Sequence, residues 1–165
     1  MAFEIGEVEG IHEGRIFQSR KDIYDAGLHR NIQAGISGTE SGGADSIVLS
    51  GGYEDDEDFG DVIIYTGQGG NRQGRQIADQ EFRRGNRALA VSRARGLPVR
   101  VIRGYQQRTE FSPDSGFRYD GLYAVDDHWK EIGRSGYLVY RYRLRKLANQ
   151  TNEFDQGNVN DQSPS

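Results

Sequence analysis

Short apolar segments recur along the chain, and most of them are rich in β-branched and aromatic residues. They fall at residues 47–49, 62–65, 98–102, 122–125 and 137–144. Segments of this length, bounded by glycine and polar residues, are typical of β-strands. Their spacing favours a barrel or a sandwich of short strands.

One segment has helical periodicity instead. Between residues 75 and 94 the apolar side chains fall at positions 77, 78, 82, 88, 89 and 91, and arginines occupy much of the other face. This spacing predicts an amphipathic helix, or a pair of helices separated at Gly85-Asn86. The fold class expected from both patterns is α+β, mainly β.

Length and composition indicate a single domain followed by a tail. The chain has 165 residues, of which 35% are hydrophobic and 23 are glycine, a composition that suits a loop-rich β fold with one modest core. Residues 148–165 are polar and poor in aliphatic side chains, as in a linker or a disordered tail. We therefore predict a domain over residues 1–147 and a polar tail over residues 148–165.

Several classes of function are disfavoured by the composition. The chain has no cysteine, and its three histidines are far apart in the sequence, so neither a disulfide framework nor a catalytic zinc site is expected. No apolar run approaches the roughly 20 residues that cross a bilayer, and the N-terminus lacks the features of a signal peptide. We expect no metal, no cofactor, no catalytic residue and no membrane partner, and an intracellular protein.

The charge is distributed very unevenly, although the net charge is only −4. Residues 1–71 hold 14 acidic and 4 basic side chains, whereas residues 72–147 hold 17 basic and 8 acidic ones. Nearly all of the basic residues are arginine, which suits bidentate contacts to phosphate and stacking on bases. A basic surface for nucleic acid is one interpretation, and an ordinary solvated basic face is the other.

The most informative block is SGGYEDDEDFGDVIIYTGQGG at residues 50–70. Tyr53 and Tyr65 lie on either side of a predicted turn at 55–60, so a hairpin would bring them face to face around a flat polar ring such as a flipped nucleobase. Six acids occupy positions 54–61. Because they repel one another, we expect backbone amides to hold some of them and one to face a ligand amine. An ordinary acidic hairpin and a calcium site are the alternatives.

Three further segments carry weaker signals. Residues 67–75 contain glycines before the predicted helix but match neither a Walker loop nor a dinucleotide fingerprint, so they form either a loop that enters a DNA groove or a plain connection. Residues 29–38 read as a polar loop leading into a short apolar strand. In residues 118–123 the Asp120-Gly121 pair predicts a turn of architectural importance.

Taken together and in this order, seven segments resemble the SRA (SET- and RING-associated) domain, also called the YDG domain after Tyr119-Asp120-Gly121. They are AGISG at 34–38, SGGYEDD at 50–56, YTGQGG at 65–70, ADQ at 78–80, GNRAL at 85–89, RYDGLY at 118–123 and SGYLVYRYRLR at 135–145. The similarity covers most of residues 5–147. The compact spacing most resembles the bacterial branch, whose members commonly carry an HNH nuclease domain after the SRA domain.

The resemblance implies a curved, PUA-like β-barrel with flanking helices that binds double-stranded DNA containing modified cytosine and flips 5-methylcytosine into a pocket. It implies that Tyr53 and Tyr65 sandwich the base and that Asp56 accepts a hydrogen bond from its exocyclic amine. Backbone or hydroxyl contacts to the polar edge of the base are implied for two further positions, and proximity to the methyl group for a third, these being Gly52, Thr66 and Gln68.

Outside the pocket, the resemblance implies that Gln33 fills the space left in the duplex and that Arg30 contacts a phosphate. Animal members that prefer hemimethylated CpG have a longer finger loop with an Asn-Lys-Arg triplet, of which only residues 71–75 remain here. Arg72 and Arg75 in this short loop are candidate contacts to the DNA backbone. Because the finger loop is short, a strict CpG or hemimethyl preference is not expected.

The leading hypothesis is a non-catalytic reader in the bacterial cytoplasm. The main alternative is the specificity domain of a modification-dependent HNH restriction endonuclease whose nuclease domain is absent from this chain. The full-length protein would then include that nuclease domain, or would form a homodimer. A base-processing enzyme that uses Asp55 or Asp56 as a general base and a protein-interaction module are further alternatives.

Overall fold

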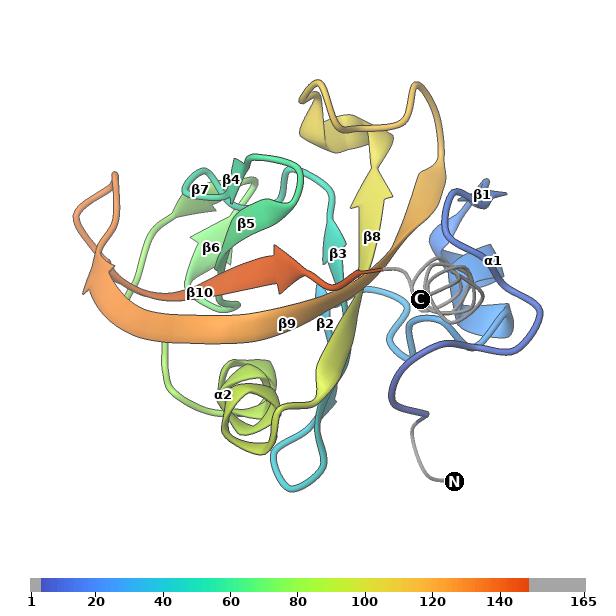
Figure 1. The fold of residues 1–165 in the computed structure, drawn as a ribbon. Coiled ribbons are helices and arrows are strands. Elements are labelled where there is room, and N and C mark those ends of the chain that lie inside the picture. Colours follow the sequence, from blue (N-terminus) through green and yellow to red (C-terminus); the bar gives the residue numbers. More distant parts are fainter. Residues whose placement is uncertain (1–3, 149–165) are drawn as a thin grey trace, which may run out of the picture.

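The computed structural model describes residues 4–148 and is dominated by β-structure (Figure 1). The strands are β1 (Ile16–Phe17), β2 (Ile36–Thr39), β3 (Gly43–Leu49), β4 (Glu57–Asp58), β5 (Val62–Thr66), β6 (Asn71–Arg72), β7 (Arg75–Gln76), β8 (Pro98–Gly104), β9 (Phe117–Ile132) and β10 (Leu138–Lys146). The helices are α1 (Arg20–Asp25), α2 (Gly85–Arg95) and the 3-10 turn η1 (Tyr105–Gln107). Apart from Ala148, the predicted tail lies outside the described residues.

The main sheet is mixed and strongly curved. Its strands follow the order β2-β3-β8-β9-β10-β5-β4, with β1 added beside the start of β9. β3 and β8 are parallel, and the other neighbours are antiparallel. The long strand β9 sweeps across the molecule and α2 packs against β2, β3 and β9 (Figure 1). The predicted mainly-β, barrel-like fold with flanking helices is confirmed, with a sheet that curves but does not close.

All five predicted strands are present, but two other predictions are wrong. Tyr119, Asp120 and Gly121 lie inside β9 instead of in a turn, and Gly121 has a φ of 92° beside a register shift between β8 and β9. A glycine with positive φ here forms a bulge in a continuing strand, which sequence alone does not distinguish from a turn. The predicted helix over 75–94 begins only at Gly85, because Arg75 and Gln76 pair with β6 as strand β7.

The core consists of two clusters. One lies between the curved sheet and α2 and includes Ile47, Leu89 and Tyr142, and the other lies beneath α1 and includes Ile23, Leu28 and Tyr119. Arg100 of β8 is fully buried, and it donates hydrogen bonds to backbone carbonyls and to Asp45. No helix in residues 4–148 is both long enough and apolar enough to cross a membrane.

Candidate functional site

A cavity of about 490 Å³ opens where several loops meet one end of β5. Its walls come from the loop before β2, the segment after β3, β5 with the loop that follows it, and the segment leading into α2. Six of the residues predicted from sequence line this one cavity, namely Gln33, Gly52, Tyr53, Asp56, Tyr65 and Gln68. The structure thus brings together residues from segments up to 35 positions apart.

The two tyrosines reach the cavity from different local structures. Tyr65 lies in β5 and is 2% exposed, and its hydroxyl donates to the carbonyl of Val48 at 3.4 Å. Tyr53 lies in the loop before β4, and its hydroxyl accepts a hydrogen bond from the Gly69 amide at 2.9 Å. Burial raises the pKa of both phenols, so both rings are neutral and present uncharged aromatic surface to the cavity.

Gly35 lets the loop before β2 pass directly over Tyr65. A Cβ at this position would lie 2.6 Å from the Tyr65 hydroxyl, so either the ring or the loop would have to shift. Sequence analysis placed Gly35 in a polar loop and assigned it no role. The close approach joins loop 33–35 to β5 and fixes one wall of the cavity.

Asp56 is the carboxyl group of the cavity. Its Oδ1 accepts a hydrogen bond from the backbone amide of Thr66 at 2.7 Å. Burial raises the pKa of Asp56 to about 7, against the opposing effects of the hydrogen bonds from Thr66 and the charge of Arg141. Thr66 is buried and does not line the cavity, so it contributes here by orienting Asp56.

The neighbouring acids are distributed among different partners. Glu54 accepts from the Gln76 amide at 2.9 Å, and Asp55 accepts from the Arg134 amide at 3.0 Å. Glu57 and Asp58 bind the guanidinium groups of Arg141 and Arg103, each at 2.8 Å. The expectation that backbone amides hold part of the acidic run is confirmed. Residues 4–148 contain no cluster of three or more His, Cys, Asp or Glu that could hold a metal ion.

The glycine-rich loop after β5 is held by three side-chain amides. The side chain of Gln80 donates to the backbone carbonyl of Gly67 at 2.6 Å, and that of Gln76 donates to the backbone carbonyl of Gly69 at 2.7 Å. The side chain of Asn86 accepts from the backbone amide of Gln68 and donates to its backbone carbonyl. The ADQ and GNRAL segments were noted in the sequence, but no local signal assigned this role to them. Gln68 Oε1 is buried and has no hydrogen-bond partner among the described residues.

Gln33 is exposed at the mouth of the cavity on a hydrogen-bonded turn. The Asn31 side chain accepts hydrogen bonds from the amides of Gln33 and Ala34 at 2.9 and 2.7 Å. Arg20, at the start of α1, donates to three carbonyls of the same turn, those of Asn31, Gln33 and Ala34. The sequence does not identify Arg20 as part of this site, because nothing near it in the chain indicates that its guanidinium reaches this loop.

His29 supports the same turn from inside the protein. One ring nitrogen lies 2.8 Å from the Ala34 carbonyl oxygen and the other lies 2.5 Å from the Ser46 hydroxyl. Burial lowers the pKa of His29 to about 3, so the ring is neutral at physiological pH and serves as a structural support.

The other predicted DNA contacts lie outside the cavity. Arg72 and Arg75 are exposed on a two-residue hairpin whose turn, Gln73-Gly74, has positive φ at both positions. The Arg30 amide donates to the Ser37 hydroxyl, and its side chain is half-buried. Two arginines not singled out from the sequence, Arg83 and Arg84, contribute to the cavity wall.

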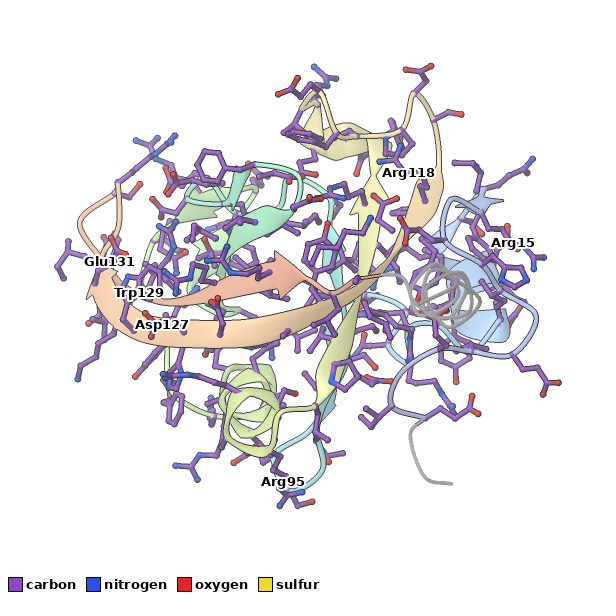
Figure 2. All side chains as sticks on the ribbon, viewed as in Figure 1. Arg15, Arg95, Arg118, Asp127, Trp129 and Glu131 are labelled. Atoms are coloured by element: carbon purple, nitrogen blue, oxygen red, sulfur yellow. The ribbon has the colours of Figure 1, made fainter. Side chains whose placement is uncertain are left out.

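The uneven charge of the sequence is largely resolved by pairing across the fold. Arginines of the second half bind acids of the first half in the pairs Arg100–Asp45, Arg103–Asp58, Arg134–Asp55 and Arg141–Glu57. Two other arginines are widely separated, with Arg95 at the C-terminal end of α2 and Arg118 near the start of β9 (Figure 2). Part of the basic second half is therefore used to bind acids of the first half.

Comparison with known proteins assigns this chain to a family. The sequence matches the SAD/SRA domain family over residues 4–150, and the chain therefore belongs to that family. It is 43% identical over 154 residues to the histone-lysine N-methyltransferase family member SUVH9 of Arabidopsis thaliana and 40% identical over 164 residues to the E3 ubiquitin-protein ligase UHRF1 of Danio rerio. These matches cover 88% and 86% of this chain but only 24% and 21% of the relatives.

Solved structures give the same result. The modification-dependent TagI restriction endonuclease superposes with a TM-score of 0.85 at 46% identity, over 92% of this chain and 55% of that one. The SRA domain of SUVH5, solved in complex with methylated CHH DNA, superposes with a TM-score of 0.75 at 42% identity, over 89% of this chain and 96% of that one. The resemblance inferred from the seven sequence segments is confirmed.

Proposed function

We propose that this chain is a non-catalytic module that binds double-stranded DNA containing 5-methylcytosine or another 5-modified cytosine, and that the modified base flips into the cavity. The observation that carries the proposal is the convergence of Tyr53, Tyr65 and Asp56 on one cavity. Its volume of about 490 Å³ lies within the range of small-molecule sites. The similarity to the SUVH5 domain solved with methylated DNA supports the same function.

In this proposal the rings of Tyr53 and Tyr65 stack on the two faces of the base. Flipping costs a few kcal/mol in lost pairing and stacking, and each aromatic stack returns about 1–3 kcal/mol. A hydrogen bond from the exocyclic amine to Asp56 adds to this total. A backbone contact to the remaining polar edge is assigned to Gly52, which lines the cavity, whereas Thr66 is assigned the orientation of Asp56.

Selection for the modification is assigned to Gln68. Its buried and unpartnered Oε1 supports a position facing the ligand, and Asn86 fixes its backbone on both sides of the residue. One buried methyl group is worth about 1 kcal/mol, so the preference for methylated over plain cytosine should be about five- to tenfold. Larger substituents at the same carbon of the base would meet Gln68 first.

The duplex around the flipped nucleotide is assigned to residues at the mouth of the cavity. Gln33 enters the space that the base leaves, supported by the rigid turn that Arg20 and Asn31 hold. Arg30, Arg72 and Arg75 contact the phosphate backbone, which positions the protein without reading sequence.

Fluorescence anisotropy with three duplexes of one sequence tests the proposal. The duplexes are unmodified, hemimethylated and fully methylated, and all titrations use one salt concentration because phosphate contacts make affinity depend strongly on salt. We expect tighter binding of both methylated duplexes. Equal affinity for all three would reject the proposal.

A second candidate function follows from the similarity to the TagI restriction endonuclease. This chain covers 55% of that protein, which supports a role as the specificity part of a modification-dependent nuclease, with the cutting domain elsewhere in a longer protein or on a partner chain. Incubation of this chain with methylated plasmid and magnesium should leave the plasmid intact. Cleavage would show that the chain itself is catalytic and would contradict its assignment as a reader.

A further inference from the structure

Asp56 differs from the acids beside it in having no cationic partner. Asp55, Glu57 and Asp58 each form an ion pair with an arginine, at 3.9, 2.8 and 2.8 Å. Within residues 4–148 no ion pair involves Asp56, although it lines the cavity and is half-buried. A carboxylate that is removed from water and has no counter-ion favours its neutral form.

The groups around Asp56 do not compensate for its charge. Tyr53, from the same segment, and Tyr65, from β5, are uncharged, and the charge of Asp55 disfavours ionisation of Asp56. Arg141 of β10 favours ionisation, but its guanidinium binds Glu57 at 2.8 Å. Four charged side chains, of both signs, contribute to the cavity wall from the segment leading into α2, namely Asp79, Glu81, Arg83 and Arg84.

The hydrogen bond from Thr66 makes the two oxygens of Asp56 different. Oδ1 accepts from the Thr66 amide at 2.7 Å, which favours Oδ1 as the carbonyl-type oxygen of a neutral acid. The acid proton then resides on Oδ2. In this form Asp56 presents one acceptor, the second lone pair of Oδ1, next to one donor, the Oδ2 hydroxyl.

This arrangement matches the Watson–Crick edge of cytosine. That edge carries an amine donor beside the ring nitrogen N3, which is an acceptor. An ionised carboxylate has acceptors only, so it binds the amine but opposes the lone pair of N3. A neutral carboxylic acid satisfies both atoms.

We propose that Asp56 binds the flipped cytosine while one proton lies between the carboxyl group and N3, so that base binding takes up a proton from solvent at neutral and alkaline pH. The inference rests on the proposed function and adds the protonation state in which Asp56 binds the flipped base. The proton count is the same whether the proton resides on Oδ2 or on N3, because the two groups titrate as a coupled pair.

The direction of the pH dependence follows from the protonation state of Asp56 in the protein without DNA. Since burial raises the pKa of Asp56 to about 7, the carboxyl group is already neutral below that pH, and the affinity is then constant. Above pH 7 the free protein loses the proton that the complex retains. The dissociation constant for modified DNA should therefore rise about tenfold between pH 6 and pH 8. Arginine–phosphate contacts do not titrate in this range, so binding of unmodified DNA should change little.

The test is a set of anisotropy titrations from pH 6 to pH 8.5 at constant salt, with a fully methylated duplex and its unmodified counterpart. In addition, calorimetry of the wild-type chain at pH 8 in two buffers of different ionisation enthalpy counts the protons taken up. We expect about one proton per methylated site and the tenfold change in affinity. A wild-type preference for methylated DNA that is independent of pH, with no proton uptake, would overturn the inference.

Asp56→Asn sharpens the test, because an amide offers an acceptor and a donor that do not titrate. This variant should bind the methylated duplex with a flat pH profile and more tightly than the wild type at pH 8.5. The matched control, Asp61→Asn, removes one exposed acid outside the cavity and should retain the wild-type slope.

The outcomes separate the two levels of the proposal. Loss of all methyl preference in Asp56→Asn, with a flat wild-type profile, would show that the ionised carboxylate is required and would overturn only the protonation step. A wild type without methyl preference at any pH would instead reject the proposed function. Should Asp56→Asn fold poorly, the wild-type proton count decides alone.

Discussion

Asp56 and Asp58 lie two positions apart in the chain, yet their carboxyl groups have opposite electrostatic environments. The side chain of Asp58 is fully buried and binds Arg103 through both oxygens, at 2.8 and 2.9 Å. Arg103 also binds Asp120 at 2.8 Å, so one guanidinium connects β8, β9 and the acidic hairpin. Asp56 lines the cavity and accepts a hydrogen bond from the Thr66 amide, and within residues 4–148 it forms no ion pair.

The difference separates a carboxylate that binds parts of the fold together from one that is proposed to bind the base. Although burial disfavours its charged form, hydrogen bonds to Asp58 and Asp120 hold the pKa of Arg103 above its usual value. In this cluster each buried charge has an opposite charge beside it. Asp56 instead lines the cavity with a raised pKa and accepts a hydrogen bond from the Thr66 amide, an environment typical of carboxyl groups that bind ligands.

The largest effect is expected from breaking the paired region. Arg103→Met removes the cation from two buried carboxylates, and this should lower the free energy of unfolding by about 3–5 kcal/mol. Urea denaturation at pH 7 measures the change. The control, Arg145→Met, removes a mainly exposed arginine bound to Asp126 and should cost less than about 1 kcal/mol. Equal losses of unfolding free energy in the two variants would contradict the distinction between the buried ion-pair cluster and an exposed ion pair.

Truncation in the cavity should affect binding far more than folding. Tyr53→Ala removes one of the two proposed stacking surfaces, and it should weaken binding of methylated duplex by about 1–3 kcal/mol, which removes the preference over unmodified duplex. Asp56→Ala should also abolish that preference. As a control, Phe59→Ala removes a ring that is 59% exposed and lies outside the cavity, and it should leave the preference intact.

Substitution by asparagine should change the free energy of unfolding in opposite directions at Asp56 and at Asp58. Because the pKa of Asp56 in the folded protein is about 7, well above its usual value, the stability contributed by its neutral form is present at low pH and is lost as the pH rises through 7. Asp56→Asn should therefore raise the free energy of unfolding by about 1–2 kcal/mol at pH 8 and by less at pH 5.5. Asp58→Asn should lower it at both values. Chemical denaturation at the two pH values measures both changes. Destabilisation by Asp56→Asn at pH 8 would contradict the expected difference between the two aspartates.

The smallest expected effect lies outside both regions. Arg30→Gln should weaken all duplexes alike and reduce the slope of log affinity against log salt by about 0.9, as expected for one lost phosphate contact. Arg95→Gln, on an exposed residue at the far end of α2, should leave the slope unchanged (Figure 2). A loss confined to methylated duplex in Arg30→Gln would move that arginine from the backbone to the base.

Much of the fold was predictable because strand composition is local. The segments at 62–65 and 98–102 became β5 and β8 with small changes at their ends. Predictions that depended on glycine were weaker, since Gly121 has a positive φ within a continuing strand, where a turn was expected. The predicted start of the helix was wrong because Gln76 pairs with β6 and its side chain holds the Gly69 carbonyl.

The sequence by itself determined the paired tyrosines, the acidic run and, through seven segments in order, the family. The resemblance already indicated Asp56 as the acid that faces a ligand, but only the tertiary structure decided which acids of the run are paired with arginines. The partners of Asp58 and Glu57 are Arg103 and Arg141, residues 45 and 84 positions away, and strand pairing brings them together. Electrostatic energy depends on distance in space and on burial, and neither can be read from separation along the chain.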